Sequence, residues 1–170
     1  MEKINLNVAD LFCGIGGFSK GFEKAGFNVI FGLDNWDIAL KTFKKNHTDA
    51  ESLNQDIKEV PDSFYKNYNG KIDVIIAGPP CQGFSMSGKR DINDKRNTLF
   101  EEVIRAVKII QPKIVLIENV VGLLSMKNPD GKLVKEIIKE KLEELGYQTE
   151  YKILNASDYG VPQSRKRVVF

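Results

Sequence analysis

Residues 5–27 read NLNVADLFCGIGGFSKGFEKAGF, and this stretch decides the fold class. The apolar run that ends near Phe12 predicts a strand, and the residues after the glycine cluster follow the period of an amphipathic helix. Phe18 and Phe22 fall on one face of that helix, and Gly26 stands where a helix C-terminal glycine belongs. A strand that leads through a glycine turn into a helix is typical of a parallel α/β sheet.

The same alternation continues along the chain. Further strands are expected at 28–34, 52–57, 71–78, 113–120 and 147–156 and from 165 onward, and further helices at 36–47, 98–111 and 130–147. The pattern predicts one α/β domain over residues 1–170, with a mostly parallel sheet and helices on both faces. Residues 78–96 show neither the period of a helix nor that of a strand and are rich in Gly, Ser, Asp and Lys, so we expect a long functional loop there.

Composition limits the class of protein. The 170 residues are 42% hydrophobic and 28% charged, as expected for a globular domain, and the net charge of +2 does not by itself indicate nucleic acid. Two cysteines and one histidine are too few for a disulfide framework or a usual zinc site, so no metal is expected. We find no signal peptide and no apolar run long enough to span a membrane, which favours a reducing cytoplasm.

Ligands of such sheets bind at the carboxyl ends of the strands. There, Gly14, Gly16 and Gly17 would let the backbone pass close to a ligand, and Asp34 follows Gly14 by 20 residues, a spacing that suits a carboxylate on ribose hydroxyls. The spacing G-x-G-G differs from the dinucleotide pattern G-x-G-x-x-G, so a nucleoside without pyrophosphate fits better. The alternative is a tight turn beside a surface aspartate.

Two more residues extend this candidate nucleoside site. Asp56, expected at the end of the third strand, could bind an adenine amino group, or it could be a turn-forming aspartate. Trp36, the one tryptophan, could stack near an adenine, although packing on a helix face is the more common role of such a residue.

Residues 78–90 read GPPCQGFSMSGKR and set Cys81 behind two prolines that fix the path of the chain. Lys89 and Arg90 lie in the same loop, and nearby cations favour the thiolate, which is the nucleophilic form. The alternative is a cysteine that only fills space. Cys13, between Phe12 and a glycine, is better explained by packing.

Charged residues follow the later strands. Glu118 ends the apolar run KIVLI, where a carboxylate is rare unless it is paired or functional. Partly buried, it could hold a proton for delivery, or it could belong to a satisfied hydrogen-bond network. Near the end of the chain, Arg165 and Arg167 would share one face of a strand, either in the site or as a solvated basic face.

These motifs, in this order, resemble the cytosine-5 DNA methyltransferase family. The resemblance rests on DLFCGIGGF, GPPCQGFSMSGKR, RNTLF, IENV and QSRKR and covers nearly the whole chain. It implies a Rossmann-like methyltransferase fold that takes S-adenosylmethionine as methyl donor and releases S-adenosylhomocysteine. It also implies duplex DNA as partner, a base flipped out of the helix, and a bacterial restriction–modification system.

The resemblance assigns roles to single residues. Cys81 would attack cytosine carbon 6, Glu118 would bind N3 and the exocyclic amine, and Arg165 the base carbonyl. The cofactor would be lined by Phe12, Gly14, Ile15, Gly17, Asp34, Trp36, Asp56, Ile57, Pro80 and Leu99. DNA would be bound by Gln82, Ser85, Ser87, Lys89, Arg96, Gln163 and Arg167. Many members of the family carry Glu at the ribose position, where Asp34 or Asn35 stands here.

The resemblance leaves alternatives open. The family continues with a target recognition domain and a C-terminal segment, so we expect the fold to be incomplete at its C-terminus. The chain could be one subunit of a natural split enzyme, which would need a second chain, the product of a truncated gene, or a fragment. A transfer-RNA cytosine-5 methyltransferase uses the same motifs, and a cofactor-binding module without activity of its own is a further hypothesis. A Rossmann dehydrogenase is disfavoured by the glycine spacing and by Cys81. The target sequence and the oligomeric state do not follow from the sequence.

Overall fold

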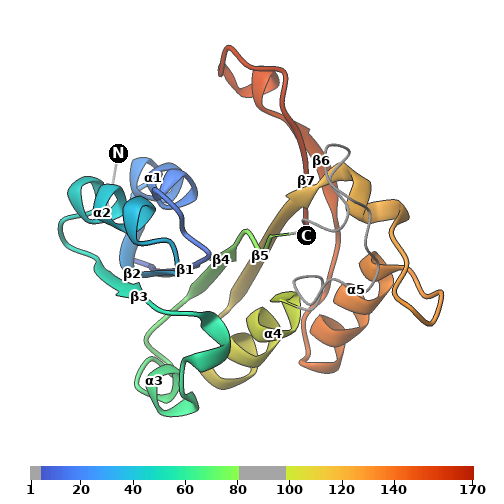
Figure 1. The fold of residues 1–170 in the computed structure, drawn as a ribbon, viewed down its shortest axis with the longest axis horizontal. Coiled ribbons are helices and arrows are strands. Elements are labelled where there is room, and N and C mark those ends of the chain that lie inside the picture. The colour runs from blue at the N-terminus through green and yellow to red at the C-terminus, as the bar shows by residue number, and fades with distance from the viewer. Residues whose placement is uncertain (1–4, 81–98) are drawn as a thin grey trace. The chain divides into compact units, whose positions relative to one another are not determined.

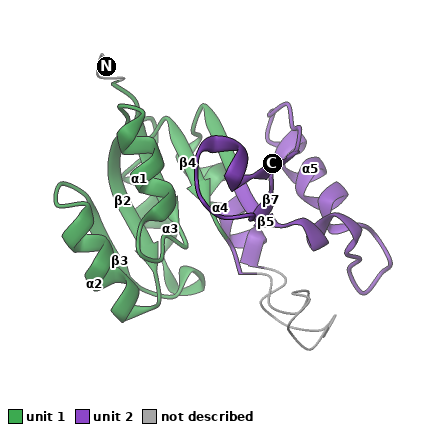
Figure 2. Ribbon diagram, turned by 90° about the horizontal axis from the view of Figure 1, so that it is seen from above, with its two compact units in different colours: residues 1–78, 105–116 green, residues 79–104, 117–170 purple. Residues whose placement is uncertain are grey.

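The computed structural model describes residues 5–80 and 99–170. It divides the chain into two compact units, residues 1–78 with 105–116 and residues 79–104 with 117–170 (Figure 2). Several predicted site residues lie outside the described residues: Cys81, Gln82, Ser85, Ser87, Lys89, Arg90 and Arg96.

The first unit contains four parallel strands. They are β1 (Asn7–Leu11), β2 (Asn28–Asp34), β3 (Glu51–Asn54) and β4 (Val74–Ala77), in the order β3-β2-β1-β4. Helices α1 (Gly17–Lys24) and α2 (Asp37–Asn46) lie on one side of these strands, and α3 (Asp62–Lys66) lies on the other (Figure 1). The predicted parallel arrangement with helices on both faces is therefore confirmed in this unit.

Alternating side chains of the strands build the core of this unit on both faces. On the side of α1 and α2, one cluster of buried residues joins Val8, Cys13, Val29, Leu40, Phe43, Val74 and Ile76. Phe18 and Phe22 of α1 pack against this cluster, as the helical period predicts. On the side of α3, Phe31 of β2 makes an edge-to-face ring contact with Phe64, with 5.4 Å between the ring centroids.

The segment after β3 differs from the expectation. The third strand ends at Asn54, two residues before Asp56, and Asp56 instead caps the 3-10 turn η1 (Ile57–Glu59). The Oδ1 atom of Asp56 accepts a hydrogen bond of 3.0 Å from the backbone N–H of Lys58. The α3 helix was not expected from the sequence, because five residues are too few to display a helical period.

The second unit pairs its strands in antiparallel fashion. The division between units falls within α4 (Leu99–Ile110) and β5 (Ile114–Val120). Strand β7 (Lys166–Val169) lies between β5 and β6 (Lys152–Asn155) and is antiparallel to both. The described strands thus form both parallel and antiparallel pairs, and most of the strands are parallel.

Helix α5 (Val134–Glu144) of the second unit is shorter than its predicted range. Lys127 and Leu133 form an isolated antiparallel bridge, which keeps the chain extended up to the helix start. The 3-10 turn η4 (Val121–Ser125) follows β5, and η5 (Ala156–Tyr159) follows β6. The predicted strand over 147–156 is confirmed only in its last half, at β6.

Candidate active site

The glycine turn after β1 has an unusual backbone. Phe12, Gly14 and Gly16 all have positive φ angles, of 62°, 53° and 86°, and Gly16 is the N-cap of α1. Positive φ is disfavoured for phenylalanine, so this conformation is held by its surroundings. A Cβ atom added at Gly14 or Gly17 would meet no other atom within 4 Å, so open space lies beside both glycines. This segment, residues 12–17, is called the glycine loop below.

Asp34, at the end of β2, ties the glycine loop to the next strand. Its Oδ2 atom accepts a hydrogen bond of 2.8 Å from the backbone N–H of Gly14, and its Oδ1 atom accepts one of 2.9 Å from the N–H of Trp36. A carboxylate oxygen can accept a second hydrogen bond, so both oxygens can still receive a hydroxyl group. The predicted proximity of Gly14 and Asp34 is confirmed, and the ribose contact stays a prediction.

Apolar side chains next to this pair are exposed. Trp36 is the N-cap of α2 and is 60% exposed, while Ile15 of the glycine loop is 57% exposed. The interpretation of Trp36 as a helix-face packing residue is therefore wrong, because its side chain is not covered. Exposed aromatic and aliphatic groups beside a carboxylate are typical of a ligand-binding surface.

Arg105 of α4 holds the segment that carries Asp56 and Ile57. Its guanidinium donates to the carbonyl oxygens of Ile57 at 2.9 Å and Val60 at 3.1 Å, and it pairs with Asp62 at 2.6 Å. The side chain of Ile57 is buried, so this residue presents mainly its backbone. Sequence reasoning missed Arg105, because α4 also carries Glu101, Glu102 and Lys108 and its charge pattern does not single out one base.

A buried acid lies below the glycine loop. Asp10 of β1 is 1% exposed, and Ser19 of α1 donates to its Oδ2 atom at 2.6 Å. Burial raises the pKa of Asp10 to about 7, although the hydrogen bonds from Ser19 oppose part of that rise. Burial also raises the pKa of the Cys13 thiol well above its ordinary value. Cys13 is thus a core residue, as expected.

Glu118 and Arg167 pair in the second unit. The Nε atom of Arg167 lies 2.9 Å from Oε1 of Glu118. The register between β5 and β7 explains the contact, because Arg167 is opposite Val120 and therefore shares a strand face with Glu118, two residues earlier. Both side chains remain partly exposed, at 31% for Glu118 and 25% for Arg167, so the pair can still meet a ligand.

Arg165 takes a different position from the one expected. Strand β7 begins at Lys166, so Arg165 precedes it, and the two arginines do not share a strand face. The backbone N–H of Arg165 donates to Oδ1 of Asn155 at 3.0 Å, and its side chain is exposed. The arginine beside Glu118 is therefore Arg167. Gln163 is exposed in the preceding turn.

Asn119 is a residue that sequence reasoning missed. It is buried, its Nδ2 atom donates to the carbonyl of Pro79 at 3.1 Å, and its Oδ1 atom accepts from the N–H of Val120 at 2.8 Å. Asn119 therefore fixes the chain two residues before Cys81. Pro80 is half-buried and Leu99 is buried.

The described residues contain neither a cluster of metal-ligating side chains nor a membrane-spanning helix. Within residues 5–80 and 99–170, no three side chains of the His, Cys, Asp or Glu type come together as metal ligands. In the same ranges, no helix has the length and apolar character that crossing a bilayer requires.

Comparison with known proteins decides the family. The sequence model of the C-5 cytosine-specific DNA methylases matches residues 6–170. The chain belongs to this family. Among curated C-5 methylase relatives, the type II methyltransferase M.DdeI of Desulfomicrobium norvegicum is 46% identical over 165 residues, which are 97% of this chain and 40% of the relative. The type II methyltransferase M1.HphI of Haemophilus parahaemolyticus is 44% identical, over 98% of this chain and 45% of the relative.

Solved structures show the methyltransferase fold. A DNA modification methyltransferase encoded within an E. coli prophage matches 98% of this chain and 46% of its own, with a TM-score of 0.77 and 33% identity. DNMT2 of Spodoptera frugiperda matches 97% of this chain and 49% of its own, with a TM-score of 0.74 and 28% identity. This C-5 methylase chain therefore spans less than half the length of these relatives, and the resemblance drawn from the motifs is confirmed.

Proposed function

We propose that the chain carries the cofactor-binding and catalytic part of a DNA (cytosine-5-)-methyltransferase of a bacterial restriction–modification system. Family membership and the type II names of the relatives support this proposal. The observation that carries it is the pairing of Glu118 with Arg167. A carboxyl group that holds a proton matches N3 and the exocyclic amine of cytosine, and an adjacent guanidinium matches the carbonyl oxygen.

The first unit offers the residues that would hold S-adenosylmethionine, and they fit this group. Asp34 has acceptor capacity left for the ribose hydroxyls, and open space lies beside Gly14 and Gly17 for a close approach of the ligand. Trp36 and Ile15 offer exposed apolar surface, and Asp56 a carboxylate for an adenine amino group. When bound, S-adenosylmethionine supplies a methyl group on a sulfonium. We propose that Phe12 and Ile57 also belong to this cofactor site; Pro80 and Leu99, which lie in the second unit, are assigned to it by the family resemblance alone.

The chemistry on cytosine would be carried by Cys81 and the Glu118–Arg167 pair. The Cys81 thiolate forms a bond to carbon 6, and the electrons of the C5–C6 double bond move to carbon 5. Glu118 stabilises the resulting enamine by holding a proton at N3, while Arg167 holds the carbonyl oxygen. Carbon 5 would then take the methyl group as the S–CH3 bond of the sulfonium breaks, leaving S-adenosylhomocysteine. A base would remove the carbon 5 proton, the C5–C6 double bond would re-form, the Cys81 thiolate would leave, and the proton held at N3 would return to Glu118.

DNA contacts complete the proposal. The target carbon is hidden inside a duplex, so the cytosine must leave the base stack before Cys81 can reach it. We propose that Gln82, Ser85, Ser87, Lys89 and Arg96 contact the DNA backbone around the flipped base, together with Gln163; Arg167, which the resemblance also assigned to DNA, acts on the flipped base itself. Such phosphate contacts position the DNA without reading its sequence. A bacterial chromosome lies in the cytoplasm, so we propose that the enzyme acts there.

The experiment is a methylation assay with tritiated S-adenosylmethionine. The chain is mixed with duplex DNA or with transfer RNA, each with and without a second polypeptide that carries the part of M.DdeI that this chain does not match. We expect label in duplex DNA in the presence of that polypeptide, and none when Cys81→Ser replaces the natural chain. Label in transfer RNA alone, equal label with the serine variant, or no label in any mixture would each overturn the proposal.

A further inference from the structure

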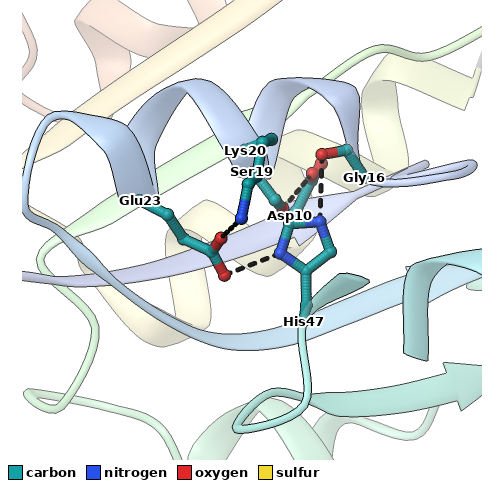
Figure 3. Close-up of polar contacts among 6 residues, drawn as sticks. All are labelled: Asp10, Gly16, Ser19, Lys20, Glu23 and His47. Carbon is teal, nitrogen blue, oxygen red and sulfur yellow. Dashed lines mark hydrogen bonds and ion pairs between the residues drawn. The ribbon is translucent and has the colours of Figure 1, made fainter. Parts of the chain in front are cut away.

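A buried histidine connects the glycine loop to α1. His47 follows α2 and is 2% exposed, and its ring lies against Phe43, with 4.5 Å between the ring centroids. Its Nδ1 atom is 2.7 Å from Oε1 of Glu23, and its Nε2 atom is 3.1 Å from the carbonyl oxygen of Gly16 (Figure 3). The ring thus bridges the N-cap of α1 and a carboxylate about two turns further along the same helix.

Gly16 is shaped to receive this ring. A Cβ atom at position 16 would collide with the His47 imidazole and would lie 2.8 Å from Cδ2 of Phe43. The backbone N–H of Gly16 donates to the carbonyl of Cys13 at 2.8 Å, and its own carbonyl also accepts the first helical bond, of 2.9 Å, from Lys20. The contact with His47 therefore acts at the residue where the glycine loop closes and α1 begins.

Both ring nitrogens face hydrogen-bond acceptors. A neutral imidazole has one N–H, so only the doubly protonated ring can donate to the Gly16 carbonyl and the Glu23 carboxylate together. Partial burial of Glu23 raises its pKa, but the hydrogen bonds from His47 and Lys20 outweigh this and lower the pKa, which keeps the carboxylate charged. Of the charged groups, Glu23 contacts the ring and Lys20 pairs with Glu23, and both are on α1. Asp10 on β1 is bonded to Ser19 of α1 (Figure 3), and α2 carries Lys44 and Lys45 in its exposed last turn.

We propose that His47 is a positioning residue, which holds the glycine loop in its cofactor-binding shape through the bond from Nε2 to Gly16. The consequence for affinity rests on the proposed function, in which this loop binds S-adenosylmethionine. The loop must keep its shape for Gly14 to reach Asp34, and Gly16 lies two residues from that contact. Loss of the Nε2 bond would free the loop and weaken cofactor binding, while the chemistry at Cys81 would not be touched.

Two substitutions separate the two bonds of the ring. In His47→Gln the amide nitrogen occupies roughly the place of Nε2, and in His47→Asn it occupies roughly the place of Nδ1. His47→Gln can therefore keep the bond to Gly16, and His47→Asn only the bond to Glu23. A matched control is Lys45→Gln, an exposed position in the last turn of the same helix.

The first measurement is the dissociation constant for S-adenosylmethionine by calorimetry, with thermal denaturation as a check that each variant is folded. We expect His47→Asn to raise the dissociation constant roughly tenfold, the scale of one hydrogen bond, and His47→Gln and Lys45→Gln to stay within about threefold of the natural chain. A role in packing alone predicts that His47→Leu, which is close to histidine in volume, binds like the natural chain, whereas loss of the Nε2 bond predicts a roughly tenfold higher dissociation constant for His47→Leu as well. Equal dissociation constants for His47→Asn and the natural chain would overturn the inference.

The second measurement needs no cofactor. Amide hydrogen exchange at Gly16, whose N–H is bonded to Cys13, should become faster in His47→Asn but not in His47→Gln. A natural chain that fails to bind S-adenosylmethionine would refute the proposed function, whereas unchanged exchange at Gly16 in His47→Asn would refute the role of His47.

Discussion

The backbone N–H of Gly14 donates to the carboxylate of Asp34 across 2.8 Å, although 20 residues separate them in the chain. The same carboxylate accepts from Trp36, so Asp34 joins the loops that follow β1 and β2. The residue that we propose for ribose binding therefore also shapes the glycine loop. A substitution at Asp34 removes a ligand contact and a loop restraint at once.

Asp34→Ala should weaken S-adenosylmethionine binding by about 1–3 kcal/mol, the cost of leaving hydrogen-bond partners unsatisfied. This corresponds to a dissociation constant roughly 5- to 150-fold higher, measured by calorimetry. Asp37→Asn is the matched control, because Asp37 is an exposed acid that pairs with Lys41 on its own helix. Equal affinities of Asp34→Ala and the natural chain would remove Asp34 from the cofactor site.

Cys81→Ser should abolish methyl transfer and leave cofactor binding intact. A serine hydroxyl is a far weaker nucleophile than a thiolate, whereas the proposed cofactor contacts come from other residues. The readouts are label transfer from S-adenosylmethionine to duplex DNA and calorimetric cofactor affinity. Methylation by the serine variant at close to the natural rate would contradict the covalent mechanism.

Arg167→Ala should lower the methylation rate far more than Arg165→Ala. Arg167 is paired with Glu118, while Arg165 precedes β7 and has an exposed side chain. Loss of a donor to a developing charge costs on the order of 100-fold in rate. The two variants are compared in single-turnover assays at saturating cofactor. A larger loss for Arg165→Ala would restore the assignment made from the sequence.

The buried acid Asp10 predicts a pH dependence of stability. The pKa of Asp10 is raised from 3.8 to about 7, so the folded chain keeps a proton that the unfolded chain has lost between these values. Below about pH 4, Asp10 makes its full contribution to the free energy of unfolding. This contribution is lost as the pH rises to about 7, and above that value the free energy of unfolding no longer changes through Asp10.

Asp10→Asn provides the comparison, because an amide of similar shape does not titrate. The unfolding free energy of the natural chain, minus that of Asp10→Asn, should fall by on the order of 4 kcal/mol between pH 4 and pH 7. Urea denaturation at several pH values measures this difference. A difference that stays constant across that range would show that Asp10 titrates alike in the folded and unfolded chains.

Much of the first unit could be predicted from local patterns. The alternation of apolar runs and helical periods identified β1, β2, α1 and α2, and Gly26 has the positive φ expected after a helix. The spacing between Gly14 and Asp34 predicted their proximity, because parallel strands bring their carboxyl ends to one edge of a sheet.

Other features depend on tertiary register and could not be predicted. In the sequence, Arg165 and Arg167 are two residues apart and cannot be told apart as partners of Glu118. Only the pairing of β7 with β5 puts Arg167 on the strand face of Glu118. The contact of Asn119 with Pro79 spans 40 residues, and the contact of His47 with Gly16 spans 31. No local period reveals such contacts, since each depends on how separate elements pack.

The burial of Cys13 has a practical consequence for thiol chemistry. The chain has two cysteines, and Cys13 is enclosed in the core with a pKa well above its ordinary value. An alkylating reagent applied to the folded protein near neutral pH would therefore spare Cys13, and any thiol label on the folded chain would report Cys81. The natural sequence thus provides a single-site probe, and the loss of that reactivity on adding DNA would report occupancy of the proposed nucleophile without any engineered label.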